Sequence, residues 1–396
     1  MVQLEGAGVA VANAAIPFLP VFMAQLGASN FQVGLLSAMP AFTGLVLSVA
    51  VGGWLSTQRS VAPWYARTRL LSILAYGLTG LVTLLLPPAY SVQAILVIWA
   101  LATVPQVIVN ITFSVVMNAV AGPQLRYDLL SRRWSMMGLI TAGGIALTGQ
   151  VLQHLRFPFN FQIAFMALSA GGLVSLIYAD RLRLPDTSRP AGPALSLAGQ
   201  ARAMGGLLRQ HPAFRGIASR RFIYMAGVTL AAPIVPLYYV RVAHADDAAI
   251  GLITTAQTLT LLIGYRVWTR LSERRGARPV LLLTTLALAI YPALMAATRQ
   301  VPLIALLAAL AGIFQGGFDL VFFDELMKRV PGDQAPLFVS FDQSAQNLAA
   351  MVAPLAGTLL ADHLGLGGAL LASAALRLVG FALFVRSAAS PEPAIT

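Results

Sequence analysis

The sequence contains no cysteine, which excludes disulfide bonds, thiolate metal sites and cysteine nucleophiles. Charged residues are also scarce: they make up 10% of the chain, against about 25% in an ordinary soluble domain. No P-loop is present, so the sequence encodes no ATP site of that kind. The four histidines are scattered, and no constellation of catalytic residues is visible. We therefore expect no enzyme activity, no cofactor and no metal site.

Apolar residues, in contrast, make up 58% of the 396 positions and give a mean hydropathy of +0.78. Such a chain has too few polar residues to cover a water-soluble surface, so its solvent must be lipid. A membrane-spanning helix needs about 20 mostly apolar residues. We predict twelve, near residues 6–26, 31–55, 70–87, 93–119, 135–155, 160–179, 221–242, 249–268, 279–297, 302–325, 337–360 and 367–386. The predicted fold class is an all-α membrane protein with short connections.

The net charge of +12 does not indicate nucleic-acid binding, because the basic residues lie in the gaps between apolar segments. With Arg221 counted in the central gap, 21 Arg and Lys fall on one side of the predicted membrane and 3 on the other. Loops rich in basic residues stay in the cytoplasm. Glu5 and the lack of a basic N-terminal segment argue against a cleavable signal peptide. We expect both termini to be cytoplasmic.

The segment 181–220 divides the chain into two similar halves, 1–180 and 221–396, each predicted to form a six-helix bundle. We interpret this Arg- and Pro-rich segment as a cytoplasmic linker with an interfacial helix. At a constant offset of 209, Gln106, Asn110, Arg133 and His154 match Gln315, Asp319, Asp342 and His363. The segment Ile16–Pro20 also resembles Ala232–Pro236. Several matches at one offset indicate a duplicated six-helix unit, a plan known from transporters.

The connection between the eighth and ninth spans carries a motif. It reads Trp268-Thr-Arg-Leu-Ser-Glu-Arg-Arg-Gly-Ala-Arg-Pro-Val-Leu281 and resembles the loop signature of the major facilitator superfamily. Arg274, Gly276 and Arg278 match the signature, and Glu273 stands where the family usually has Asp. We expect Gly276 to form a turn with positive φ between two helix ends. The resemblance implies two six-helix bundles and alternating access about a central site formed by helices 1, 4, 7 and 10.

The same resemblance implies a cytoplasmic gate. In the family, the motif loop of one half contacts the start of the fifth or eleventh helix of the other half. Glu273 would then meet Arg133, and Arg59 would meet Asp342. The remaining gate residues are Arg274, Gly276 and Arg278. Each contact would be partly hydrated and worth about 1 kcal/mol, which suits a reversible latch.

Asp319 is the most informative polar residue within a predicted span. It lies about seven residues from the cytoplasmic end of the tenth helix, which is about 10 Å deep at 1.5 Å per residue. A carboxylate at such a depth is costly and marks a functional candidate. As a functional group, Asp319 would carry a proton, since desolvation favours the neutral acid. As a structural group, it would pair with Arg377 of the twelfth helix, which could otherwise pair with Asp342.

Other polar side chains fall on helices expected to line the cavity. These substrate-cavity candidates are Asn13, Gln106, Asn110, Tyr224, Thr229, Tyr238 and Gln315. They could hydrogen-bond a polar substrate or join helices to one another. No Arg or Lys lies mid-span on helices 1, 4, 7 or 10, which argues against a phosphate or dicarboxylate substrate.

Together these features predict a secondary active transporter, acting as a monomer in a bacterial inner membrane among membrane lipids. The first hypothesis is proton-coupled export, by antiport, of a small amphipathic or uncharged compound. The second is uptake of a neutral solute such as a sugar or nucleoside, by symport or facilitated diffusion. The third, of another class, is a membrane sensor or lipid scramblase that transports no solute.

The asymmetry of basic residues leads to a direct test of topology. Reporter fusions at Pro185 and at Thr396 should both report a cytoplasmic location, because 21 basic residues lie on that side against 3 on the other. Activity of a periplasmic reporter at either position would overturn the predicted orientation.

Overall fold

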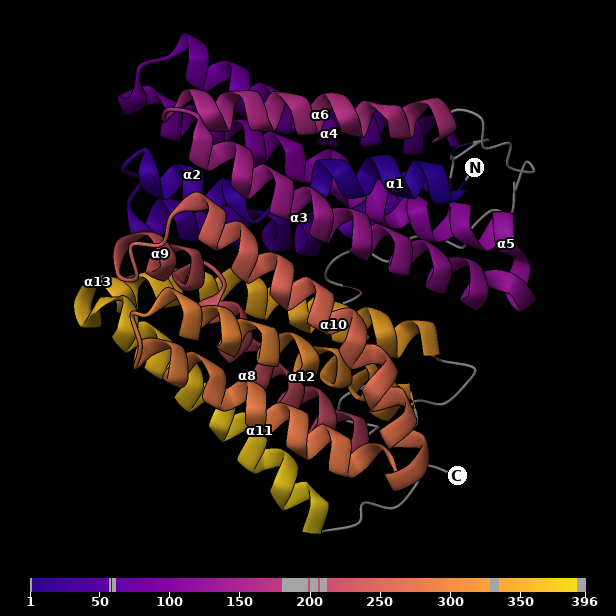
Figure 1. The fold of residues 1–396 in the computed structure, drawn as a ribbon. Coiled ribbons are helices and arrows are strands. Elements are labelled where there is room, and N and C mark those ends of the chain that lie inside the picture. The colour runs from indigo at the N-terminus through magenta and orange to yellow at the C-terminus, as the bar shows by residue number, and fades with distance from the viewer. Residues whose placement is uncertain are drawn as a thin grey trace. The chain divides into compact units, whose positions relative to one another are not determined.

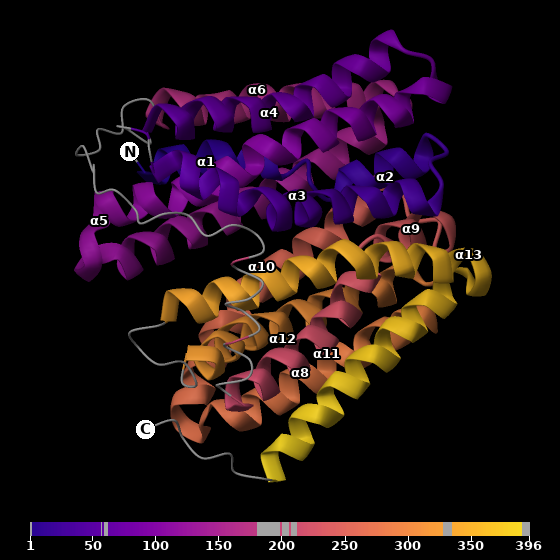
Figure 2. The same cartoon turned by 180° about the vertical axis from the view of Figure 1, so that it is seen from behind.

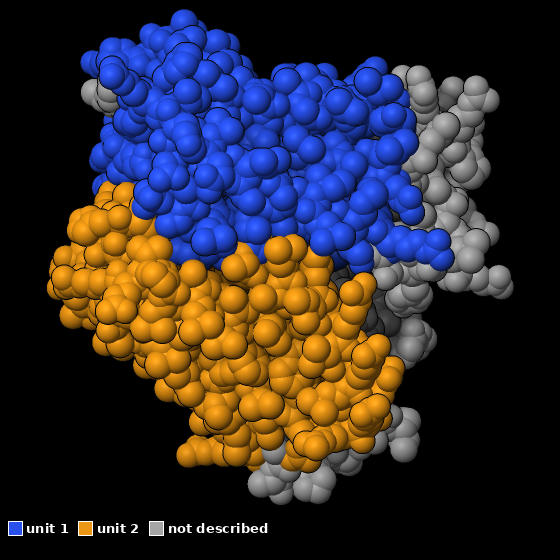
Figure 3. Space-filling view, viewed as in Figure 1, with its two compact units in different colours: residues 1–197, 246–255 blue, residues 198–245, 256–396 orange. Residues whose placement is uncertain are grey.

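The structure, a computed structural model, describes residues 2–56, 58, 62–179, 199, 206, 212–327 and 335–389. Every regular element in these ranges is an α-helix, which confirms the predicted fold class. The chain divides into two compact units, coloured separately in Figure 3. Unit 1 comprises residues 1–197 and 246–255, and unit 2 comprises residues 198–245 and 256–396. The predicted domains 1–180 and 221–396 stay a prediction.

Unit 1 contains the first six helical elements (Figure 1). They are α1 (Val2–Asn13), α2 (Phe18–Gln25), α3 (Asn30–Ser56), α4 (Ala62–Leu85), α5 (Pro88–His154) and α6 (Phe159–Ala179). The later elements, seen from behind in Figure 2, are α8 (Pro212–Ala231), α9 (Ile234–Arg241), α10 (Asp247–Arg275), α11 (Ala277–Ala296), α12 (Val301–Met327) and α13 (Ala335–Ala389). Within unit 1, α1 and α4 pack against α5 and α6; within unit 2, α13 packs against α8 and α11.

α5 contains two membrane crossings. It is helical over 67 residues, which would be about 100 Å of straight helix, roughly three times the hydrocarbon thickness. The Arg133 guanidinium nevertheless lies 4.8 Å from the centroid of the Phe113 ring, although a straight helix would separate these residues by about 30 Å. The element therefore turns back between them. The connection between the predicted spans 93–119 and 135–155 is itself assigned as helix, which the sequence did not predict.

α13 also contains two crossings, and this brings the number of spans to twelve. Eleven stretches of the described chain are long and apolar enough to cross a membrane. The last of them, Phe341–Arg386, has 46 residues. Gly365 interrupts it with non-helical backbone angles, φ 75° and ψ 166°, so that it forms two helices. The twelve predicted spans are thus confirmed.

The first membrane helix of each half is broken at a repeated proline. In unit 1, α1 ends at Asn13 and α2 begins after Pro17. Pro17 has no N–H to donate to the carbonyl of Asn13, which accepts a hydrogen bond from the N–H of Ile16 instead. In unit 2, Pro233 separates α8 from α9 in the same manner. The sequence analysis noted the repeated segment but did not predict the breaks.

One predicted boundary shifts in the structure. The seventh membrane helix begins with α8 at Pro212 and not at residue 221. Proline is well suited to the first turn of a helix, where its missing N–H costs nothing. Most of the predicted linker 181–220 lies outside the described residues, so the interfacial helix stays a prediction.

Close helix packing in unit 1 depends on a small residue where α4 crosses α6. A Cβ atom built on Gly80 would lie 2.6 Å from the backbone carbonyl oxygen of Gln162. In contrast, no atom of a neighbouring segment lies within 4 Å of a Cβ built on Gly143 in α5. The first glycine therefore has no room for a side chain, and the second has ample room.

These two glycines form a matched pair for a stability test. Gly80→Ala should lower stability by about 1–3 kcal/mol, because the added methyl group overlaps backbone and forces α4 and α6 apart. Gly143→Ala should leave stability unchanged or raise it, since alanine is the better helix former. Thermal melting of the purified variants measures both effects. Equal melting temperatures would contradict the packing described.

Candidate functional site

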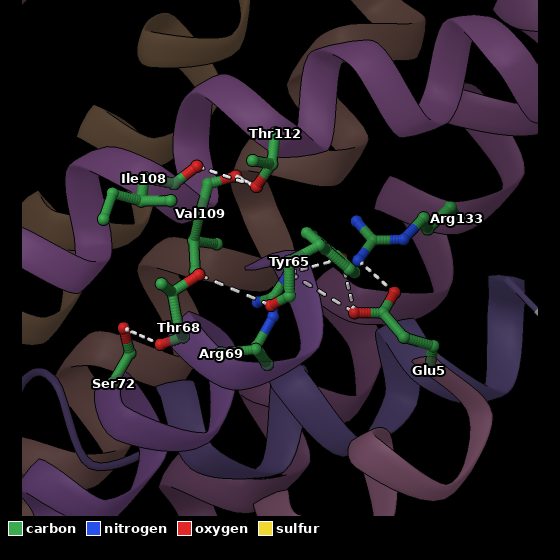
Figure 4. A network of polar contacts seen from close by, with 9 residues as sticks. All are labelled: Glu5, Tyr65, Thr68, Arg69, Ser72, Ile108, Val109, Thr112 and Arg133. Atoms are coloured by element: carbon green, nitrogen blue, oxygen red, sulfur yellow. Dashed lines mark hydrogen bonds and ion pairs between the residues drawn. The ribbon is translucent and has the colours of Figure 1, made fainter. Parts of the chain in front are cut away.

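A buried ion network in unit 1 joins α1, α4 and α5 (Figure 4). Glu5 is fully buried, and its carboxylate is bonded through both oxygens. One oxygen accepts a hydrogen bond from the Tyr65 hydroxyl at 2.8 Å and lies 3.3 Å from Arg69 Nη2. The other accepts from Arg133 Nη2 at 2.7 Å. Two guanidinium groups therefore share one carboxylate at the start of the first helix.

The aromatic rings beside this network hold its cations in place. The Arg133 guanidinium packs over the Phe113 ring, and the Arg69 guanidinium over the Tyr65 ring at 4.9 Å. Arg69 Nη2 also lies 2.6 Å from the Tyr65 hydroxyl oxygen. Such cation–π contacts stabilise charge away from water. The network thus satisfies a carboxylate that would otherwise be very costly at this depth.

Unit 2 contains a corresponding ion pair. The Arg221 guanidinium of α8 binds the Asp342 carboxylate of α13 through Nη1 and Oδ2. The same guanidinium packs over the Phe322 ring of α12, 4.8 Å from its centroid. Asp342 is buried, with 5% of its surface exposed. The Arg221 side chain thus joins the seventh membrane helix to the eleventh through the ion pair and to the tenth through the ring contact.

The two ion pairs occupy equivalent positions with their charges exchanged. Glu5 precedes Pro17 by 12 residues, and Arg221 precedes Pro233 by 12 residues. At the offset of 209, Arg133 corresponds to Asp342, and the supporting ring of Phe113 corresponds to that of Phe322. Each half therefore ties its first helix to its fifth by a buried ion pair over an aromatic ring, with the anion on the first helix in unit 1 and on the fifth in unit 2.

Asp319, the predicted proton carrier, is bonded to neutral groups. Its carboxylate accepts a hydrogen bond from Gln315 Nε2 at 2.7 Å and another from the Tyr265 hydroxyl at 3.2 Å. Asp319 is exposed on the surface of the chain. The alternative of an Arg377 pair with Asp319 or Asp342 is not formed in this structure: the buried Arg377 guanidinium donates to the backbone carbonyl of Leu288 at 2.9 Å.

Three of the substrate-cavity candidates take part in helix packing. Tyr224 is fully buried and donates its hydroxyl to the Thr285 carbonyl at 2.9 Å. Tyr238 is buried, and its hydroxyl lies 2.9 Å from the Thr298 carbonyl oxygen. Thr229 bonds back to the carbonyl of Met225 in its own helix. For these residues the structure supports the alternative role of joining or capping helices.

The remaining candidates lie on helix faces that are not fully buried. Gln106 is half-buried and Asn110 is exposed, one turn apart on α5. Gln315 is half-buried beside Asp319, and Asn13 is half-buried at the end of α1, next to the helix break. These side chains remain candidates for contact with a polar substrate.

The motif loop has the predicted turn. Gly276 has a φ of 84° and stands between the end of α10 and the start of α11, which confirms the expected conformation. Glu273, Arg274 and Arg278 are exposed. Arg59 lies outside the described residues. The other gate residues, Arg133 and Asp342, are bonded to Glu5 and Arg221, so a latch through Glu273 stays a prediction and requires these pairs to open.

The sequence analysis missed four residues of the two ion networks: Glu5, Tyr65, Arg69 and Arg221. It treated Glu5 only as evidence against a signal peptide and counted Arg221 only as a topology signal. A usable signal was present, because aligning the two proline breaks places Glu5 opposite Arg221. Opposite charges at one repeat position, each matched by the reverse charge on the fifth helix, indicate a pair.

Residues 217–395 match the family profile of the Major Facilitator Superfamily. The multidrug resistance protein MdtG of Salmonella choleraesuis (strain SC-B67) is 29% identical over 166 residues, and MdtG of Citrobacter koseri is 30% identical over 166 residues. Each alignment covers 41% of this chain and 41% of the relative. The matched part thus spans about two fifths of the length of these curated relatives.

Solved structures resemble the chain over nearly its whole length. The nucleoside transporter NupG superimposes with a TM-score of 0.73, covering 98% of both chains at 14% identity. A bacterial homologue of the iron transporter ferroportin, in an inward-facing state, also gives a TM-score of 0.73, covering 98% of both chains at 15% identity. At such low identity the likeness shows the fold alone.

The ion network of unit 1 leads to a stability prediction. Glu5→Gln should destabilise the protein by about 3–5 kcal/mol, because it leaves two buried guanidinium groups without an anion. Glu273→Gln removes an exposed carboxylate and should change stability by less than about 1 kcal/mol. Thermal melting of both purified variants tests this. If the Glu5→Gln variant has the same melting temperature as the unmodified protein, the network does not stabilise the fold.

Proposed function

We propose that the chain, whose residues 217–395 match the family profile of the Major Facilitator Superfamily, is a secondary active transporter that moves a small amphipathic or uncharged compound by alternating access. Transport is coupled to protons and runs in the direction of export. The protein acts as a monomer in a bacterial inner membrane, with both termini in the cytoplasm. Its partners are the transported compound, protons and the surrounding lipids.

The observation that carries this proposal is the placement of Asp319. This carboxylate lies within an apolar helix, is exposed on the surface of the chain, and is bonded to the neutral groups of Gln315 and Tyr265. An ionised carboxylate at membrane depth is costly, and a protonated one is tolerated. Asp319 is therefore suited to take a proton from one side and to release it when water reaches it from the other.

Export of an amphipathic compound is supported by the curated relatives, which are named multidrug resistance proteins. A second candidate function is uptake of a neutral solute such as a nucleoside, and one solved structure with the same fold is a nucleoside transporter. In both cases the amides of Gln106, Asn110 and Gln315 supply uncharged hydrogen-bonding groups.

The test uses the purified protein in liposomes with an imposed pH gradient and two probes, the lipophilic dye Hoechst 33342 and radiolabelled uridine. Asp319→Asn mimics the protonated acid, so proton-driven accumulation should fall at least tenfold while exchange of probe across the membrane persists. The control Asp362→Asn removes an exposed carboxylate and should keep both activities.

The outcomes separate the hypotheses. Dye movement against the proton flow supports export, and uridine movement with the proton flow supports uptake. If neither probe nor a wider panel of solutes moves, a sensor or lipid scramblase becomes the better account. A folded Asp319→Asn variant with undiminished proton-driven accumulation eliminates the coupling role of Asp319.

A further inference from the structure

One guanidinium group in unit 2 is bonded to one carboxylate and packs over a ring that lies one helical turn from a second. Arg221 is bonded to Asp342 and packs over Phe322. Asp319 precedes Phe322 by three residues on α12, so the two side chains are neighbours along the helix. The charge of Arg221 consequently acts on Asp319 as well as on Asp342. Of the two carboxylates, only Asp342 is bonded to the cation.

The equivalent cluster of unit 1 has the opposite balance of charge. There, Arg69 and Arg133 share the single carboxylate of Glu5. The position equivalent to Asp319 is Asn110, which carries no charge. Unit 1 thus has one carboxylate bonded to two cations, whereas unit 2 has two carboxylates and one cation, Arg221, in its cluster.

The Asp342 carboxylate also makes fewer hydrogen bonds than the Glu5 carboxylate, its counterpart in unit 1. Both oxygens of Glu5 are bonded. In unit 2, the buried Asp342 Oδ1 makes no hydrogen bond, whereas an unbonded arginine Nε occurs in both networks, at Arg69 and Arg133 as well as at Arg221. Buried polar atoms without partners destabilise the arrangement that contains them. The two networks therefore differ at the carboxylate: Asp342 has one oxygen without a hydrogen bond, and Glu5 has none.

We propose that Asp319 and Asp342 share one proton and that Arg221 pairs with whichever of the two is ionised. This inference rests on the proposed proton coupling and adds a second proton-carrying carboxylate to it. Asp319 releases its proton to water, the Arg221 side chain moves from Asp342 to Asp319, and Asp342 takes a proton from water. Only O–H bonds break and form, and the charge of the cluster is the same before and after.

The groups that face the two carboxylates are consistent with this exchange. Asp319 accepts hydrogen bonds from Gln315 on its own helix and from Tyr265 on α10, and it lies one turn from the Phe322 ring over which Arg221 of α8 packs. Asp342 faces Gln346 on its own helix and Arg221 on α8. Arg221 is the one cation among these groups, so it cannot neutralise both carboxylates at once.

The first measurement is infrared spectroscopy of the full-length protein in lipid bilayers, which follows the C=O band of protonated carboxyl groups against pH. In Asp342→Asn, Arg221 is free to pair with Asp319, so the Asp319 band should disappear at a pH at least one unit lower than in the unmodified protein. Arg221→Gln should move it in the opposite direction. Asp362→Asn is the control and should leave the midpoint unchanged.

The second measurement is a double-mutant cycle in thermal stability. Asp319→Asn and Asp342→Asn should each be tolerated, because Arg221 keeps one carboxylate. The double variant leaves Arg221 without a carboxylate and should lose far more stability than the two single variants lose together. Adding Arg221→Leu to it should recover most of this loss. Glu5 has no second carboxylate nearby. The single variant Glu5→Gln should therefore lose as much thermal stability as the double variant.

The failure of this inference can be told apart from failure of the proposed function. If neither Asp342→Asn nor Arg221→Gln moves the Asp319 midpoint, or if the stability losses simply add, the sharing of one proton is overturned even when proton-driven flux depends on Asp319. Shifted midpoints and non-additive losses without any proton-driven flux would support the sharing and reject the transport proposal.

Discussion

A charge buried at membrane depth has to be paired, and this requirement shapes both halves of the molecule. Removing one partner from a buried ion pair costs about 3–5 kcal/mol. The chain meets the requirement twice, with Glu5 against Arg133 and with Arg221 against Asp342. In each case the guanidinium also packs over an aromatic ring, and in each case the pair ties the N-terminal part of the first helix of the half to its fifth helix.

The exchange of charges between the halves has a consequence for chemistry. Unit 1 has an excess of positive charge around Glu5, whose carboxylate joins α1 to α4 and α5 through two ion pairs. Unit 2 has an excess of carboxylates, because Asp319 stands where unit 1 has the neutral Asn110. The same duplicated framework thus supports a fixed pair in one half and, as proposed, a proton-accepting group in the other.

The fold could be predicted from the sequence, but the candidate site could be predicted only in part. Apolar runs predicted twelve spans, and the motif predicted the positive φ of Gly276, because both depend on local chain properties. Ion pairing depends on which helices pack together, so Arg133 was placed opposite Glu273 although it binds Glu5. The burial of Tyr224 and the helical turn of α5 likewise depend on tertiary packing, which the spacing of residues does not reveal.

The central claim is that both halves contain the same buried ion pair with exchanged charges. Magic-angle-spinning NMR of the protein in lipid bilayers, with 15N in arginine and 13C in the carboxyl groups, measures the guanidinium–carboxyl distances directly. The account predicts two contacts at hydrogen-bonding distance, one between Glu5 and Arg133 and one between Arg221 and Asp342. The absence of either contact would contradict it.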